Sequence, residues 1–167
     1  MRLEQYSFGK LSIIWIKRVL MTAEILQRLI RIFDSRSIVV SLTALDLHSN
    51  LMDRVHENPS AFHSIAPEQE TVTAETLIAA NTEDILSLSN LLSVCDARSI
   101  TFYGVDKSLS IDDLQAFRYT QSEALVINGD VKYCISAINE ECVISIMLNR
   151  SIVETRTITA ELKALFK

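Results

Sequence analysis

Three histidines lie close together in the sequence, and carboxylates among them could share a metal ion. His48, His56 and His63 follow one another at spacings of eight and seven residues. Acidic residues lie between and beside them: Asp46, Asp53 and Glu57. Imidazole and carboxylate groups together are typical ligands of zinc or iron. The spacings do not match the His-x-x-x-His pair that sets two imidazoles on one helix face. We therefore predict no metal site and no cofactor, and these histidines are the only candidate ligands.

Thiol chemistry is the second possibility. The chain has three cysteines, Cys95, Cys134 and Cys142, and no Cys-x-x-Cys pair. An odd count without such a pair is typical of free, reduced thiols in the cytoplasm. Cys95 falls on an apolar helical stripe and Cys142 is expected beneath helices, so Cys134 is the candidate reactive thiol. One functional hypothesis is therefore a small cytosolic enzyme that uses Cys134 or the His/Asp segment. It is the alternative to the non-enzymatic binding domain that is argued below.

Glycine-dependent phosphate chemistry is excluded. A phosphate-binding loop needs several glycines so that backbone N–H groups can approach the anion. The only glycines, Gly9, Gly104 and Gly129, are isolated from one another. A Gly-x-Ser-x-Gly nucleophile elbow is also absent.

Composition indicates a folded domain without a membrane span. The 167 residues are 49% hydrophobic and 22% charged, which suits one compact domain over 1–167. No uncharged apolar run reaches the length of a transmembrane helix, and no signal peptide is recognisable at the start. The expected location is the cytoplasm.

Charge is unevenly distributed along the chain. The net charge is −5, yet residues 1–36 carry seven basic and three acidic groups, which leaves a clear acidic excess in the remainder. Binding to nucleic acid needs concentrated Lys and Arg, so it is not expected of this acidic body. A basic protein partner fits better, because complementary charge steers the encounter.

Hydrophobic periodicity places helices and strands along the first two thirds of the chain. A basic amphipathic helix is predicted at about 19–34, and Ser110 is predicted to cap a helix that starts at Ile111. The other expected elements are a strand broken at Gly9 within 3–16, strands at 37–45 and 99–104, helices at 49–57, 73–80 and 81–95, and a loop at 58–70.

The pattern of the C-terminal third of the sequence predicts the fold class, which is α+β. Asn128-Gly129 is a strong signal for a hairpin turn, and a second turn is expected at Asn139-Glu140. Alternating apolar residues then give the predicted strands one apolar face. Its members are Val131, Tyr133, Ile135, Ala137, Cys142, Ile144, Ile146 and Leu148. We predict a C-terminal antiparallel β-meander of three to four strands, about 123–148 with a fourth strand at 152–158, covered by amphipathic helices. A terminal helix is expected at about 159–167.

These observations favour a non-enzymatic, acidic protein-binding domain that neutralises or escorts a specific basic protein partner. Immunity proteins that block toxins and dedicated chaperones are of this physical type. The expected partner-binding residues are acidic and lie near one helix start and one hairpin tip: Asp106, Asp112, Asp113, Glu140 and Glu141. A third interpretation is a self-associating subunit, a homo-oligomer. Its contact would come from the strand at 38–42 or from the side formed by Ile138, Val143 and Met147.

Overall fold

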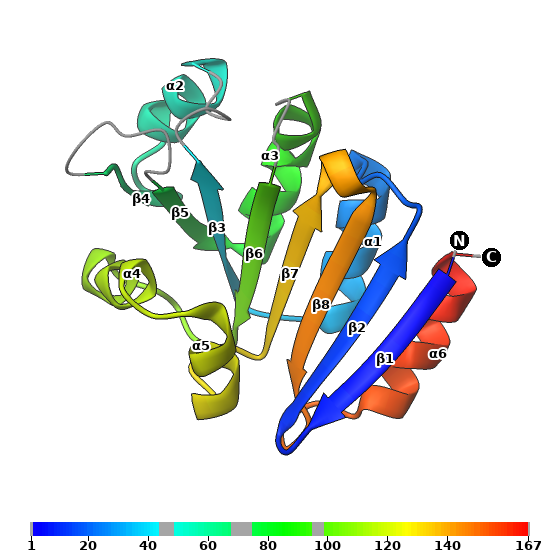
Figure 1. Ribbon diagram of the computed structural model, residues 1–167. Helices are drawn as coiled ribbons and strands as arrows, with labels where there is room; N and C mark the ends of the chain where they lie inside the picture. Colours follow the sequence, from blue (N-terminus) through cyan, green and yellow to red (C-terminus); the bar gives the residue numbers. More distant parts are fainter. Residues whose placement is uncertain (1, 44–48, 68–74, 95–98, 167) are drawn as a thin grey trace.

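The computed structural model describes residues 2–43, 49–67, 75–94 and 99–166. The strands in this part of the chain form one sheet of eight, in the order β1-β2-β8-β7-β6-β3-β5-β4 (Figure 1). Every neighbouring pair is antiparallel. The strands are β1 Arg2–Phe8, β2 Leu11–Lys17, β3 Ser37–Thr43, β4 Phe62–Ile65, β5 Glu75–Asn81, β6 Ser99–Val105, β7 Tyr133–Ile138 and β8 Val143–Asn149. The helices are α1 Ala23–Phe33, α2 Ser49–Glu57, α3 Thr82–Val94, α4 Ile111–Arg118, α5 Ser122–Asn128 and α6 Thr155–Leu165, with a 3-10 turn, η2, at Asn139–Glu141.

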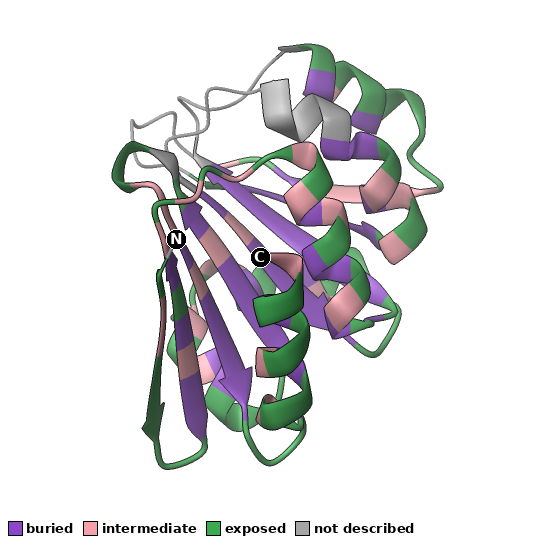
Figure 2. Cartoon of the chain, turned by 90° about the vertical axis from the view of Figure 1, so that its right-hand side faces the viewer, coloured by how far each residue is buried: buried purple, intermediate pink, exposed green. Residues whose placement is uncertain are grey.

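One face of the sheet packs against α1, α2, α3 and α6 (Figure 2). Side chains alternate between the two faces of a strand, so residues paired across neighbouring strands line up in rows. A fully buried row crosses six strands on this face: Ile14, Ile146, Ile135, Phe102, Val40 and Ile78. Above it α1 buries Leu26, Leu29, Ile30 and Phe33. This face holds the larger apolar core.

The opposite face is only partly covered. Here α4 and α5 bury Leu114, Phe117, Leu125 and Val126 against one end of the sheet. Tyr6, Trp15 and Ile138 project from the same face and remain more than a third exposed. We call this uncovered part, on β1, β2, β8 and β7, the open face. Two of the residues proposed above for self-association, Ile138 and Val143, lie on the open face. The other proposed contact, the strand at 38–42, is β3, which lies between β5 and β6 and has no free edge.

The predicted C-terminal meander of three to four strands is wrong, although the α+β class is right. Residues 123–127 belong to α5, because Asn128-Gly129 ends a helix and does not turn a hairpin: Gly129 is its left-handed cap at φ 84°. The predicted fourth strand, 152–158, is a turn followed by the start of α6. Only β7 and β8 of the meander exist, and they lie in the interior of the eight-stranded sheet.

The register of β7 and β8 also differs from the prediction. A turn at Asn139-Glu140 would pair Ile138 with Glu141, whereas η2 and the left-handed Cys142 make Ile138 pair with Val143. The shift is two residues along the strand, so the side chains that lie within β7 and β8 keep their predicted faces. Tyr133, Ile135, Ala137, Ile144, Ile146 and Leu148 are accordingly buried on the helix-covered face, while Val131 joins the other core and Cys142 lies in the turn.

Two further segments differ from the prediction. The segment predicted to be helical at 73–80 contains β5, whose residues Thr76–Ala80 are buried between β3 and β4. The expected loop at 58–70 contains the short edge strand β4. None of the described helices is both long enough and apolar enough to cross a membrane.

Candidate partner-binding site

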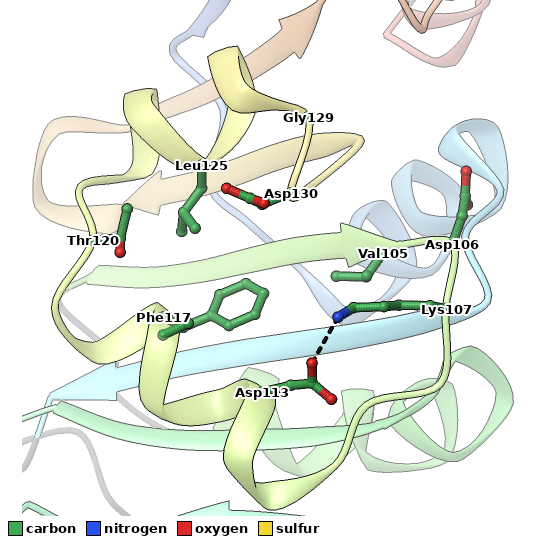
Figure 3. Close-up of a pocket in the computed structure, with 10 residues that line it drawn as sticks. Val105, Asp106, Lys107, Asp113, Phe117, Thr120, Leu125, Gly129 and Asp130 are labelled. Carbon is green, nitrogen blue, oxygen red and sulfur yellow. Dashed lines mark hydrogen bonds and ion pairs between the residues drawn. The ribbon is translucent and has the colours of Figure 1, made fainter.

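A cavity of about 470 Å³ lies between α4, α5 and the carboxyl end of β6 (Figure 3). It combines apolar walls with charged groups. The lining residues are Val105, Asp106, Lys107, Asp113, Ala116, Phe117, Thr120, Leu125, Gly129 and Asp130. Its volume falls within the range of small-molecule binding pockets.

The N-terminus of α4 fixes one carboxylate at the cavity. Ser110 and Asp113 form a capping box, in which the Ser110 backbone N–H donates to Asp113 Oδ2 at 2.8 Å and the Asp113 N–H donates to Ser110 Oγ at 3.3 Å. Lys107 Nζ lies 2.6 Å from Asp113 Oδ1. The Lys107 ammonium, followed by the hydrogen bonds from Ser110, holds the pKa of Asp113 well below its usual range. Asp113 is therefore ionised at neutral pH.

Hydrogen bonds to the sheet hold α5 on the other side of the cavity. The buried Asn149 donates from Nδ2 to the Val126 carbonyl at 2.8 Å, and the hydroxyls of Tyr103 and Ser122 share a hydrogen bond of 2.8 Å. The Gly129 N–H closes the helix on the Val126 carbonyl at 3.2 Å. Because Gly129 takes the left-handed conformation, the chain turns there and brings Asp130 to the cavity.

The cavity is amphipathic. Val105, Phe117 and Leu125 supply its apolar surface, and the Phe117 ring packs edge-on against Tyr103 with centroids 5.5 Å apart. In Figure 3 the Asp130 side chain points toward Leu125, and Lys107 reaches Asp113. An alkyl chain that ends in a cation suits such a surface, since its methylenes contact the apolar wall and its charged end meets a carboxylate.

The structure brings together only some of the acidic residues predicted from sequence. Asp106 and Asp113 both line the cavity, although Figure 3 shows Asp106 turned away from its centre, and Lys132 Nζ lies 3.6 Å from Asp106 Oδ1. Asp112 is exposed in the first turn of α4 and is not part of the lining. The other two predicted residues, Glu140 and Glu141, lie in η2 at the far end of β7 from the cavity (Figure 1).

Sequence reasoning missed Lys107 and Asp130. Lys107 is three residues before the helix cap Ser110, a spacing that carries no recognised signal. Asp130 was hidden by the hairpin interpretation of Asn128-Gly129. Reading the same dipeptide as a helix end would have placed Asp130 just beyond a C-terminal cap.

Cys134 does not have the environment of a reactive thiol, contrary to the sequence prediction. Its side chain is fully buried between α5 and the sheet, and burial raises the pKa of the thiol to about 12. A protonated, inaccessible thiol is a poor nucleophile. Cys142, predicted to be buried, is half-buried in the turn after η2, and Cys95 lies outside the described residues.

The histidines do not form a cluster in the described part of the chain. His56 is exposed on α2, His63 is half-buried on β4, and His48 lies outside the described residues. His63 lines a second, smaller cavity of about 180 Å³ with polar neighbours that include Ser37, Asn81 and Ser108. Among the described residues no group of three or more His, Cys, Asp or Glu side chains is arranged to hold a metal ion.

The chain matches no protein-family model, no curated protein and no solved structure. The cavity between α4 and α5 is the described location where predicted partner-binding residues and apolar side chains line a common pocket.

Proposed function

We propose that this protein is a non-enzymatic binding domain that takes up a lysine or arginine side chain of a basic protein partner in the cavity between α4 and α5. The observation that carries the proposal is the combination, in one cavity, of an apolar wall with the carboxylates of Asp113 and Asp130. The wall suits the methylene stem of a basic side chain, and the carboxylates suit its charged end.

Lys107 supports this assignment from within the chain. Its ammonium already contacts Asp113 at 2.6 Å, so the cavity holds one intramolecular cation of the kind we propose for the partner. Asp130 forms a second carboxylate at the same cavity, across from that ion pair (Figure 3). An incoming guanidinium is expected to engage Asp130 and to share or displace the contact of Lys107 with Asp113.

The charge of the whole chain favours the same kind of partner. A net charge of −5 attracts a basic protein over a distance of about one Debye length, roughly 8–10 Å at physiological salt. Binding of this type neutralises or escorts the partner and needs no bond-making step, as in immunity proteins that block toxins and in dedicated chaperones. Electrostatic complementarity would then set specificity and the rate of association.

The test is a titration followed by NMR with N-acetyl-arginine amide as the probe and the neutral citrulline analogue as its isostere. We expect the arginine probe to shift the backbone amides of Lys107, Phe117 and Gly129, and citrulline to leave them unchanged. Asp130→Asn should weaken binding of the arginine probe by about tenfold or more, the usual consequence of losing a charge-assisted hydrogen bond.

Asp112→Asn is the matched control, because it changes the net charge equally but lies outside the cavity lining. It should bind the probe as the wild type does. Equal shifts with arginine and citrulline, or equal effects of the Asp112 and Asp130 substitutions, would refute the assignment of the cavity.

A further inference from the structure

The strand β1 forms an open edge of the sheet. It has seven residues and pairs only with β2 among the described strands. In Figure 1 α6 lies beside and behind β1, on the helix-covered side of the sheet, and its Thr159 Oγ1 donates to the Gln5 side-chain Oε1 at 3.3 Å. This contact involves side chains only, and among the described strands the backbone of β1 pairs with β2 alone. Its outer row of backbone groups is therefore available to another strand.

This edge lacks the features by which proteins usually protect an edge strand. The opposite edge, β4, has only four residues and prolines on both sides, Pro59 and Pro67. β1 contains no proline, and its pairing with β2 runs without a bulge from Arg2 to Phe8. Its two charged side chains are already paired within the chain, because Glu4 lies 2.9 Å from Arg2 and 2.8 Å from Lys17.

The hairpin geometry determines which backbone groups point outward. β1 and β2 are joined by a two-residue turn at Gly9-Lys10, with Phe8 opposite Leu11. In such a hairpin the pair next to the turn is hydrogen-bonded, and hydrogen-bonded and non-hydrogen-bonded pairs then alternate. The alternation directs the N–H and C=O groups of Leu3, Gln5 and Ser7 toward the free edge.

We propose that a second copy of this chain pairs with this edge, β1 against β1 in antiparallel orientation, about a two-fold axis at Gln5. In this register Gln5 faces Gln5 of the second copy, and Leu3 faces Ser7 on either side. All three outward-facing residues of each strand are then paired, and each pair exchanges two hydrogen bonds. The contact is isologous, so it closes as a dimer and uses the free edge of both copies.

Side-chain complementarity favours this register over the one shifted toward the N-terminus. It places Arg2 opposite the Phe8 ring and Glu4 opposite the Tyr6 hydroxyl of the second copy. Phe8 and Tyr6 are 64% and 41% exposed, so the pairing covers part of an exposed aromatic surface. The register shifted by two residues toward the N-terminus would place Glu4 opposite Glu4, a like-charge contact that opposes pairing. The proposal is independent of the cavity between α4 and α5, which lies away from this edge (Figure 1).

Sedimentation equilibrium of the full chain tests the dimer, and cysteine cross-linking tests the register. We expect a mass of twice 18.8 kDa at high protein concentration. Gln5→Cys should form a disulfide-linked dimer under mild oxidation, because residues of a hydrogen-bonded pair lie about 5.5 Å apart at Cα, which a disulfide can span. Ser7→Cys is the matched control, since it is exposed but faces Leu3, and it should cross-link no more than the wild type.

Ser7→Pro removes one outward N–H donor while sparing the bonds to β2, so circular dichroism should show an intact fold. It should raise the dimer dissociation constant at least about tenfold, since two copies of the donor are lost. A monomer at every concentration up to millimolar, a dimer unaffected by a well-folded Ser7→Pro variant, or faster cross-linking through Ser7→Cys than through Gln5→Cys would each overturn the proposal.

Discussion

At the scale of single residues, Asp113 stabilises a helix and lines the cavity with the same carboxylate. It accepts hydrogen bonds from the backbone N–H and the hydroxyl of Ser110 at 2.8 Å each, and it contacts Lys107. Since these partners favour the ionised form, the pKa of Asp113 is lower in the folded chain than in the unfolded one. A depressed carboxyl pKa stabilises the fold at neutral pH, and this contribution disappears in acid.

Asp113→Asn should therefore lower the free energy of unfolding by about 1 kcal/mol at neutral pH, a typical value for damage to a helix cap. The difference from the wild type should persist down to about pH 4, the region of the unfolded-state pKa, and shrink as the pH falls further. Urea unfolding at a series of pH values measures it. Asp112→Asn, in the same helical turn, is the comparison, and a deficit for Asp113→Asn that stays constant or grows in acid would contradict the argument.

At the scale of elements, β6 and β7 approach one another through a glycine. Gly104 pairs with Tyr133, and the Tyr133 ring covers the position where a Cβ of residue 104 would lie. The ring is held in place by a hydrogen bond of 3.0 Å between the hydroxyls of Tyr133 and Ser35 and by the Phe33 ring, whose centroid is 4.8 Å away. A glycine here lets a large buried side chain lie flat across the neighbouring strand.

Gly104→Ala should consequently destabilise the fold by about 1–3 kcal/mol, the usual cost of overpacking a core. Chemical denaturation of a double-mutant cycle with Tyr133→Leu isolates the contact, because the added methyl group should cost much less once the ring is gone. An equal cost in both backgrounds would show that the strand backbone, and not the Tyr133 ring, requires glycine at this position.

Local patterns predicted elements well where one signal had one meaning, and poorly where it had two. Ser110 and the residues after it carry a capping signal that only a helix start explains, and α4 begins there. Asn128-Gly129 serves equally a hairpin turn and a helix end, since both need positive φ, and here it ends α5. In β5 the alanines favour a helix by propensity, but burial between β3 and β4 determines a strand.

At the scale of the whole molecule, strand order could not be predicted because it depends on contacts distant in sequence. β8 pairs with β2, so Leu11 lies opposite Asn149, and β3 pairs with both β5 and β6. The cavity could be predicted only in part for the same reason. Asp106 and Asp113 could be selected from the sequence as exposed acidic residues near a helix start. Their proximity to Asp130 depends on how α5 is held over the sheet by Asn149.

The pairing of β2 with β8 also determines how the sheet should unfold. Ile146 is fully buried and lies between Ile14 of β2 and Ile135 of β7, so it joins the N-terminal hairpin to the rest of the sheet. Ile146→Ala should lower the free energy of unfolding by about 2–5 kcal/mol, and Ile152→Ala, at a half-exposed position, by about 0.5 kcal/mol or less. Hydrogen exchange of the backbone amides distinguishes two modes of opening.

If the row of buried side chains makes the sheet one cooperative unit, Ile146→Ala should reduce the protection of amides in β2, β7 and β6 by the same factor. If the β1–β2 hairpin detaches on its own, only β1 and β2 should lose protection. The buried row from Ile14 to Ile78 is continuous across six strands. The helices that cover it also contact one another, because α1 packs against both α3 and α6. We therefore expect the cooperative outcome, and a selective loss in the hairpin would contradict it.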